Sequence, residues 1–321
     1  ACIDIQKEAN MDDADLAIVL TNSDELNVFA CLVAKKIGVK NTIARVRNPD
    51  YRKQIMEMKD DLGIAMIVNP EMEMANEIFN IINLPSVAQI EHFAKGRVSL
   101  VEIVVEKGCP IIGESLITFG KKLHTKVLIC AVQRGEEVII PSGNFVIQEG
   151  DKIHFTSDAR MLGDFLAEIN LVKSPLKNVM IIGGGRISYY LANALSQKKY
   201  DIKLFENNSK KAEELAELLP RVTVICGNGT QHDVLLEEGI EAMDALVALT
   251  DIDEENMIVS MFANKMKVKK SITKIKNDDL YGILDELGIK NNVSPKHVVA
   301  DRVTSYIRAL ANTVGSNVLT M

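Results

Sequence analysis

The sequence lacks any apolar run near the ~18 residues that are needed to cross a bilayer, so no segment is predicted to span a membrane. It also lacks a concentrated run of lysine or arginine, and its formal net charge is −7. Nucleic-acid binders usually carry a basic face, because neutralising phosphates dominates their affinity. The charge pattern therefore argues against a nucleic-acid partner.

Metal-ligand spacings are absent as well. The five cysteines form no CxxC, and the five histidines show no HxxxH, so a metal site is not predicted. Cys31, Cys130 and Cys226 lie in apolar runs, which is typical of buried free thiols in a reducing cytoplasm. With 321 residues, of which 47% are hydrophobic and 25% charged, the chain is predicted to form two or three globular domains.

The main positive feature is an internal repeat. VLTNSDELN at 19–27 returns as ALTDIDEEN at 248–256, and the register holds without a gap for about 50 residues. Identical residues then coincide: Thr21 with Thr250, Asp24 with Asp253, and Asn27 with Asn256. After a four-residue shift, LGIAMIVNP aligns with LGIKNNVSP. This register indicates the duplication of a large unit, longer than the repeats of solenoid proteins.

The second copy alternates apolar runs with amphipathic segments. Continuous apolar runs suit strands that are buried on both faces of a parallel sheet. Strands are expected at 178–182, 201–206, 222–226, 244–250 and 271–275, and helices at 186–197, 210–219 and 255–266. This alternation predicts an α/β protein with a doubly wound parallel sheet. Thr230 and Asp233 are expected to start a further helix as a capping box.

A glycine-rich turn, IIGGGRISYYLA, lies between the first expected strand and helix. Gly183 permits a tight turn, Gly185 lets the backbone approach a pyrophosphate, and the helix N-terminus offers free N–H groups to phosphates. Ser188 replaces the third glycine of GxGxxG and is still small. Glu206, 23 residues after Gly183, can accept hydrogen bonds from ribose hydroxyls and would repel a 2′-phosphate, which favours NAD or an adenine nucleotide over NADP. The alternative is a tight turn without a ligand and a surface acid at Glu206.

Other candidate residues follow later strands. Thr250 and Asp251 end the fourth strand, where ligands of open α/β sheets bind. They can also cap the next helix, and the two roles are compatible. Lys274 and its first-copy counterpart Arg45 can reach a phosphate, or they are surface cations.

The first copy is expected to be incomplete. Ala1 aligns with Thr230, so the glycine turn and the acidic strand end would lie upstream of residue 1, and about 50 residues are missing by this alignment. We therefore expect the chain to be a fragment of a longer protein. Thr21, Asn22 and Arg45 would be the remains of another nucleotide site.

Between the copies, residues 96–168 combine strand-like segments with glycine-rich turns, which predicts a small α+β module. Residues 71–94 are predicted to form an amphipathic helix, which 296–312 match after the second copy. Such a helix packs on its own sheet or docks a partner or a second subunit.

This order of segments resembles the family of Trk potassium-uptake regulatory proteins, which are tandems of RCK (regulator of K+ conductance, or KTN) units. Each unit has an N-terminal Rossmann lobe and a C-terminal TrkA-C lobe. Residues 13–51 are close to the family's first lobe, and 134–155 are similar to its C-lobe. The resemblance implies four segments: an incomplete first N-lobe with dimerisation helices at 1–95, a C-lobe at 96–170, a complete second N-lobe at 176–312, and the start of a second C-lobe at 313–321.

The resemblance also implies a function. The protein would be a homo-oligomer, a dimer or tetramer of RCK lobes, on the cytoplasmic face of the membrane. It would bind NAD(H) or ATP/ADP and gate a potassium-translocating subunit of the TrkH/TrkG type, without catalysing a reaction. The site residues would be Gly183, Gly184, Gly185, Arg186, Ile187, Glu206, Asn228, Thr250, Asp251 and Lys274, with Thr21, Asn22 and Arg45 left from the first site.

Two alternatives belong to other classes. An NAD-dependent oxidoreductase would need an acid or base beside the nicotinamide, and His232 is the nearest candidate, although a surface histidine at a helix start is its simpler role. A nucleotide-sensing transcription regulator is disfavoured by the acidic charge and by the absence of a DNA-binding helix pair.

Overall fold

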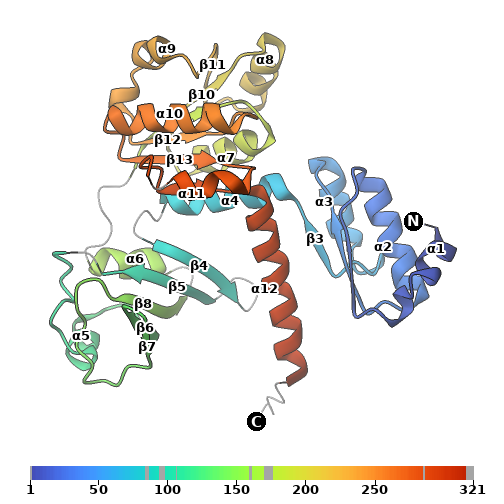
Figure 1. The fold of residues 1–321 in the computed structure, drawn as a ribbon, viewed down its shortest axis with the longest axis horizontal. Coiled ribbons are helices and arrows are strands. Elements are labelled where there is room, and N and C mark those ends of the chain that lie inside the picture. The colour runs from blue at the N-terminus through green and yellow to red at the C-terminus, as the bar shows by residue number, and fades with distance from the viewer. Residues whose placement is uncertain are drawn as a thin grey trace. The chain divides into compact units, whose positions relative to one another are not determined.

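The computed structural model describes residues 2–83, 87–93, 98–105, 107–158, 161–169, 176–284 and 286–315. The chain divides into two compact units, one formed by Ala1–Phe79 with Lys177–Met321 and the other by Asn80–Leu176 (Figure 1). Within these described ranges, no helix combines the length and the apolar character that crossing a membrane requires.

A six-stranded parallel sheet dominates the larger unit. Its strands are, in spatial order, β11 (Thr223–Cys226), β10 (Asp201–Glu206), β9 (Asn178–Ile182), β12 (Ala245–Ala248), β13 (Lys270–Lys274) and β14 (Asn291–Val293). The α-helices that follow in the chain are α7 (Arg186–Gln197), α8 (Ser209–Leu218), α9 (His232–Glu237), α10 (Asp253–Lys265), α11 (Tyr281–Leu284) and α12 (Pro295–Gly315). Short 3-10 turns are η3 (Ile240–Ala242) and η4 (Asp278–Leu280). The predicted α/β class is confirmed.

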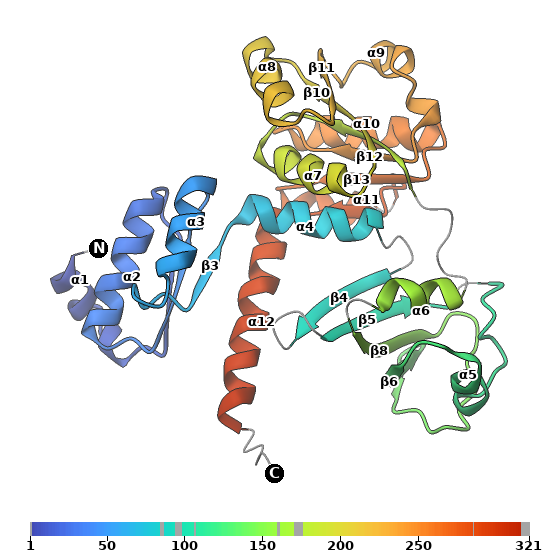
Figure 2. The ribbon, with the colours of Figure 1, turned by 180° about the vertical axis from the view of Figure 1, so that it is seen from behind.

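The order of these strands creates a switch point between β9 and β12. From β9 the chain proceeds through β10 to β11 on one side, and then returns to β12 on the other side. Helices cover both faces of the sheet: α10 lies in front in Figure 1 and α7 in Figure 2. All four residues of β12 are buried, which explains the continuous apolar run. A crevice at the carboxyl ends of β9 and β12 is where such folds place ligands.

The first copy forms a three-stranded parallel sheet in the order β1-β2-β3. Its elements are α1 (Ile3–Glu8), η1 (Met11–Asp13), β1 (Leu16–Val19), α2 (Asp24–Ile37), β2 (Asn41–Arg45), α3 (Pro49–Met58), β3 (Met66–Val68) and α4 (Pro70–Asn83). At the predicted offset β1 coincides with β12, α2 with α10 and β2 with β13, and after the four-residue shift β3 coincides with β14. The repeat is therefore structural as well as sequential.

Asp244 joins two strands at the start of the large sheet. Its carboxylate accepts hydrogen bonds from the N–H groups of Lys177 and Asn178, over 2.8 and 3.0 Å, and from Lys269 Nζ over 2.6 Å. It therefore fixes the start of β9 to that of β12. Burial alone would raise its pKa, but the Lys269 ammonium and the two N–H groups outweigh it and lower the pKa of Asp244 from 3.8 to about 2.

We expect Asp244→Asn to lower the free energy of unfolding at pH 7 by about 2 kcal/mol, the equivalent of this pKa change. A carboxyl with a depressed pKa stabilises the folded state above its unfolded pKa, near 3.8, and this contribution is lost as the pH falls toward 2. Urea unfolding at pH 7, 5 and 3 measures the free energy of unfolding of the unaltered chain and of Asp244→Asn. The difference between the two should become smaller only at pH 3. The repeat counterpart Asp15→Asn is the control, because its exposed carboxylate bonds Lys40 alone among the described residues. An equal loss of unfolding free energy in Asp244→Asn and Asp15→Asn would contradict the stabilising role of the Asp244 carboxylate.

The smaller unit contains a five-stranded antiparallel sheet in the order β4-β5-β8-β6-β7. Its elements are β4 (Val87–Phe93), β5 (Val98–Val104), α5 (Leu116–Lys122), β6 (Val127–Arg134), β7 (Glu137–Ile139), β8 (Lys152–Asp158) and α6 (Leu162–Glu168). Helix α6 lies against this sheet in Figure 2, and its Leu162, Phe165 and Leu166 belong to one cluster with buried residues of β5 and β8. The predicted α+β module is confirmed.

Of the two predicted amphipathic helices, the structure corrects the first and confirms the second. Residues 71–94 are not one helix: α4 ends at Asn83, and β4 pairs antiparallel with β5. The sequence places Pro85 between these elements, and a proline inside a helix removes a hydrogen bond and clashes with the preceding turn. The matching helix α12 forms as predicted. It packs on the sheet of the other copy, because Val303 lies in one cluster with Ile43 and Val68.

Candidate functional site

A cavity of about 880 Å³ opens at the carboxyl ends of β9 and β12, at the predicted switch point. It is lined by eleven of the predicted site residues: Gly183, Gly184, Gly185, Arg186, Ile187, Glu206, Asn228, Thr250, Asp251, Lys274 and Arg45. Thr21 and Asn22 are not part of this lining. The fold therefore brings together most of the candidates, although they lie far apart in the sequence.

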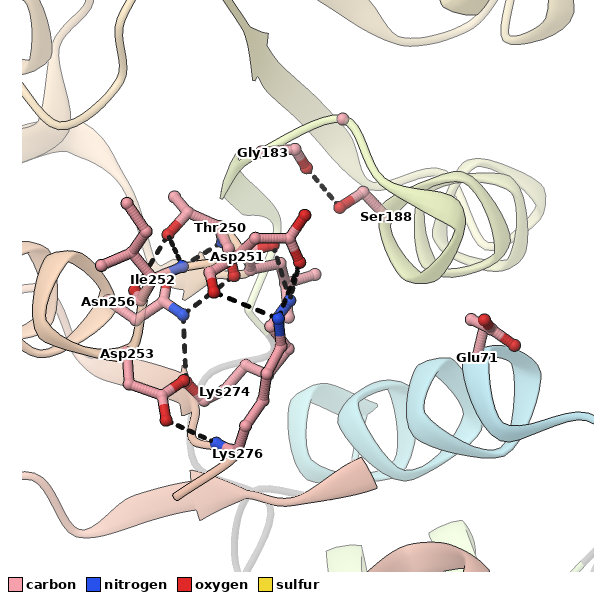
Figure 3. Close-up of polar contacts among 12 residues, drawn as sticks. Glu71, Gly183, Ser188, Thr250, Asp251, Ile252, Asp253, Asn256, Lys274 and Lys276 are labelled. Carbon is pink, nitrogen blue, oxygen red and sulfur yellow. Dashed lines mark hydrogen bonds and ion pairs between the residues drawn. The ribbon is translucent and has the colours of Figure 1, made fainter. Parts of the chain in front are cut away.

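Steric limits explain why the first two positions of the glycine turn are glycines. Gly183 has a φ of +100°, and a Cβ there would lie 3.0 Å from the Leu249 carbonyl oxygen. A Cβ on Gly184 would come within 2.6 Å of Glu206 Oε2. Ser188 is fully buried, and its hydroxyl donates to the Gly183 carbonyl (Figure 3), so a small side chain occupies the third glycine position in the packed interior.

Gly185 differs, because a Cβ there would meet nothing within 4 Å. It is the N-cap residue of α7, with extended backbone, and the first bond of the helix runs from the Tyr189 N–H to the Gly185 carbonyl. The N–H groups of the first turn thus have no partner inside the helix, and the positive end of the helix dipole lies at the cavity. This arrangement suits a phosphate group.

Glu206 is buried at 6% exposure, so its interpretation as a surface acid is wrong. It accepts hydrogen bonds from the N–H groups of Gly184 and Asn208, and an ion pair of 3.1 Å joins it to Lys211. Burial raises its pKa, but these donors outweigh burial and leave the pKa below its ordinary value. The carboxylate is therefore ionised and held rigidly at the end of β10.

The Gly-Asn-Gly-Thr loop closes another side of the cavity. A Cβ on Gly229 would lie 2.9 Å from Phe205 Cβ, so the loop passes close to the sheet. Asn228 Oδ1 accepts bonds from the N–H and the hydroxyl of Thr230. The predicted capping box at Thr230 and Asp233 is wrong, because Gln231 is the N-cap residue of α9 and the Thr230 hydroxyl is turned into the loop.

Asn256 is a structural residue of the site that the sequence analysis did not single out. It is fully buried and bonds three backbone groups: Thr250 N–H at 2.8 Å, Thr250 C=O at 3.1 Å and Lys274 C=O at 3.0 Å (Figure 3). It therefore ties the end of β12 to that of β13. Asn27 makes the same bonds to Thr21 and Arg45. Its recurrence in both copies was the available clue.

The capping role that was predicted for Thr250 and Asp251 is also corrected. Ile252 is the N-cap residue of α10 and makes no side-chain cap. The Thr250 hydroxyl instead bonds the Ile252 carbonyl at 3.1 Å. Asp253 Oδ2 accepts the N–H groups of Lys276 and Asn277, both at 2.8 Å, which fixes the loop after β13. These bonds shape the rim of the cavity.

Lys274 lies in the cavity wall at 4% exposure, so its interpretation as a surface cation is wrong. Its Nζ donates to the Leu249 carbonyl at 3.1 Å and lies 3.5 Å from Asp251 Oδ1. Burial lowers the pKa of Lys274, whereas hydrogen bonding to Lys276 and the charge of Lys274 lower that of Asp251. The wall therefore presents a desolvated ammonium beside an exposed carboxylate.

The cavity is locally cationic in an acidic chain. Among the described residues that line it, the basic ones are Arg45, Arg47, Arg186, Lys211, Lys274, Lys276 and Lys296, and the acidic ones are Glu71, Glu206, Asp251 and Glu255. Sequence analysis missed the contribution of Arg47 and Glu71, which form an ion pair that raises the pKa of Arg47. Glu71 lies on α4 (Figure 3). An excess of positive charge favours an anionic ligand.

The first copy retains only part of such a site. Arg45 donates to the Thr21 carbonyl, as Lys274 does to Leu249, and Arg45 lines the large cavity. The binding roles of Thr21, Asn22 and Arg45 stay predictions. No group of three metal-ligating side chains is present among the residues that the structure describes.

The fold and the site define a class of tandem α/β proteins. Its members combine a Rossmann-like lobe that has a glycine turn, a partial copy of that lobe and a small antiparallel lobe. The TrkA-N domain model matches residues 2–70 and 179–295, and the TrkA-C domain model matches 100–170. The chain therefore belongs to the TrkA family, as its sequence indicated.

Relatives agree with this assignment. The chain is 30% identical to the Trk system potassium uptake protein TrkA of Vibrio alginolyticus, over 95% of this chain and 67% of that protein. It is 31% identical to a Trk system potassium uptake protein TrkA homolog of Methanosarcina mazei, over 91% and 74%. Among solved structures, the GsuK channel bound to NAD superposes with a TM-score of 0.70 at 18% identity, over 96% of this chain and 54% of that one. The last likeness shows a shared fold.

Proposed function

We propose that the chain is a nucleotide-sensing regulatory part of a potassium uptake system. It binds NAD(H) or ATP/ADP in the cavity and gates a potassium-translocating membrane subunit. The observation that carries the proposal is the convergence of the glycine turn, Glu206 and Lys274 on one cavity with excess positive charge. The relatives' names supply the transport system.

Each part of the ligand has a matching part of the wall. The diphosphate rests on the first turn of α7 beside Gly185, where N–H groups and the helix dipole offset its charge. Glu206 accepts a ribose hydroxyl with the lone pair that Gly184, Asn208 and Lys211 leave free. Its ionised state disfavours a 2′-phosphate. Lys274 and Lys276 serve the distal end of the ligand.

The site is proposed to bind and not to catalyse. His232, the nearest acid or base by sequence, stacks on the Phe262 ring at 4.0 Å between centroids and is not among the lining residues. The lining contains no histidine, cysteine or tyrosine among the described residues. A hydride-transfer enzyme needs a proton donor or acceptor within hydrogen-bond reach of its substrate. The acid–base groups that do line the cavity are carboxylates and lysines, of which Lys274 donates to the Leu249 carbonyl and Asp251 is paired with Lys276. The turnover assay below therefore decides between a regulator and an oxidoreductase.

Regulation then requires unequal binding. A nucleotide shifts a gate only if it binds the open and the closed arrangements with different affinity. A tenfold preference supplies about 1.4 kcal/mol per site. In a homo-oligomeric ring of lobes on the cytoplasmic face of the membrane, several sites add their contributions. The ring, its membrane partner and the domain limits given above all belong to this proposal.

Calorimetric titration of the chain with NADH, NAD+, NADPH, ATP and ADP tests the proposal. We expect saturable binding of NADH or an adenine nucleotide, and weaker binding of NADPH. The same sample should show no substrate-dependent oxidation of NADH with common ketones and keto acids, nor reduction of NAD+ with alcohols and hydroxy acids. Binding of none of these nucleotides would refute the proposal, and turnover would favour the oxidoreductase.

A further inference from the structure

Asp251 holds an unusual position for a residue at a phosphate-binding cavity. It lies at the mouth of the cavity, and its carboxylate bonds two cations through one oxygen: Lys276 Nζ is 2.9 Å and Lys274 Nζ 3.5 Å from Oδ1 (Figure 3). An anion ligand that approached both ammonium groups would meet the Asp251 carboxylate first. A negatively charged side chain there repels a phosphate instead of binding it.

The ion pairs that join Asp251 to the two lysines are weak. The Asp251 side chain is 92% exposed, and ion pairs of exposed carboxylates contribute little because water screens them. Lys274, by contrast, is buried and has a lowered pKa, so its ammonium lacks the hydration that an exposed lysine keeps. Two cations share one carboxylate charge, which leaves the pair of lysines with a net positive charge. A phosphate with several oxygens can bond both ammonium groups at once.

The first copy lacks this arrangement. Asn22 stands at the position of Asp251, Arg45 at that of Lys274, and Arg47 at that of Lys276. Arg47 forms its ion pair with Glu71 of α4. The aspartate is thus a feature of the second copy, which also has the complete glycine turn.

We propose that Lys274 and Lys276 form a phosphate subsite which Asp251 occupies in the free protein, and that a nucleotide phosphate displaces this carboxylate on binding. The inference rests on the proposed function, which it extends by naming the regulatory step at the site. Displacement removes the side-chain contacts of Asp251, which lies between Thr250 and Ile252 in the turn before α10, and Lys276 Nζ also donates to the Asp251 backbone carbonyl at 3.1 Å. Occupancy of the subsite by a polyphosphate is thereby coupled to the backbone at the start of that helix.

The decisive variant is Asp251→Asn, which installs the residue of the first copy. If the carboxylate competes with phosphate, its neutralisation tightens the binding of ATP and of inorganic tripolyphosphate about three- to fivefold, in buffer free of divalent cations. AMP, whose single phosphate rests on α7, changes by less than about twofold. Calorimetry on the whole chain measures all three probes.

Glu255→Gln is the matched control. Glu255 lines the same cavity, but no ion pair joins it to either lysine in the described part of the chain, and its change removes an equal charge. It should alter ATP affinity by less than about twofold, because only general screening changes. Lys276→Gln should weaken ATP about tenfold, and Lys276→Arg should restore most of that loss. In the Lys276→Gln background, Asp251→Asn should increase the affinity for ATP by a smaller factor than in the unaltered chain.

Weaker binding of ATP or tripolyphosphate to Asp251→Asn would overturn the inference, since Asp251 would then contact the ligand directly. Unchanged affinity, or equal gains from Asp251→Asn and Glu255→Gln, would overturn it as well. The proposed function fails separately, if the unaltered chain binds none of NADH, NAD+, ATP and ADP while tripolyphosphate still behaves as expected. If nucleotides bind but Asp251→Asn does not bind tripolyphosphate more tightly, the proposed function stands and the displacement of the carboxylate is refuted.

Discussion

Gly185→Asp is expected to lower the affinity for NADH and for adenine nucleotides by at least about a hundredfold, which corresponds to about 2.7 kcal/mol. A Cβ at this position would meet no atom within 4 Å, and Gly185 lines the cavity. The new carboxylate would accept the N–H groups at the start of α7 and repel the diphosphate. Calorimetric titration beside that of the unaltered chain measures the loss.

This change should leave the folded state intact. Gly185 has a φ of −73°, which every residue adopts, and aspartate is a favoured N-cap residue. The midpoint of thermal unfolding should therefore stay the same or rise. Gly282→Asp is the control, because Gly282 also has no neighbour within 4 Å of a new Cβ and lies outside the cavity lining. Unimpaired nucleotide affinity in Gly185→Asp would place the phosphates elsewhere.

Asn256→Ala is expected to lower the free energy of unfolding of its lobe by about 3 kcal/mol. The change leaves one N–H and two carbonyl groups at the ends of β12 and β13 without their partner, in a fully buried position. Each unsatisfied buried group costs about 1–3 kcal/mol, and relaxation or entering water recovers part of the sum. Hydrogen exchange of the β12 and β13 amides under native conditions reports the loss for this lobe alone.

Asn208→Ala serves as the comparison. Asn208 is exposed, and its side-chain oxygen accepts one hydrogen bond, from Lys211 N–H at the start of α8. Loss of such a cap costs about 1 kcal/mol. The counterpart Asn27→Ala should resemble Asn256→Ala, because Asn27 makes the same bonds. If Asn256→Ala costs no more than Asn208→Ala, the buried amide does not hold the two strand ends.

Local chemistry made much of this protein predictable. The glycine turn could be located because a tight turn between an apolar strand and a helix restricts residue choice over a few positions. The steric limits at Gly183 and Gly184 are those restrictions in atomic form. The register of the repeat predicts the equivalence of β1, β2 and β3 with β12, β13 and β14, because a shared fold preserves residues that fix strand ends.

Elsewhere local patterns misled. Residues 87–93 have enough apolar residues for a helix, but β4 exists because β5 pairs with it, and pairing is not visible in a single segment. The short strand β14, NNV, has no strand-like composition, so the sequence predicted its alignment with 66–68 but not its strand conformation. It completes the sheet by pairing with β13. Lys274 is expected on a surface by composition alone, whereas the ends of β12 and β13 bury it.

The sequence by itself determined the repeated α/β architecture, the position of the glycine turn and the family, because each depends on periodicity and spacing along the chain. Only the tertiary structure decided which charges face one another. Arg47 and Glu71 join a cavity whose glycine turn lies far along the chain, and Asp251 lies against Lys274 and Lys276. Electrostatic interaction depends on distance and burial in space, and neither can be obtained from the order of residues.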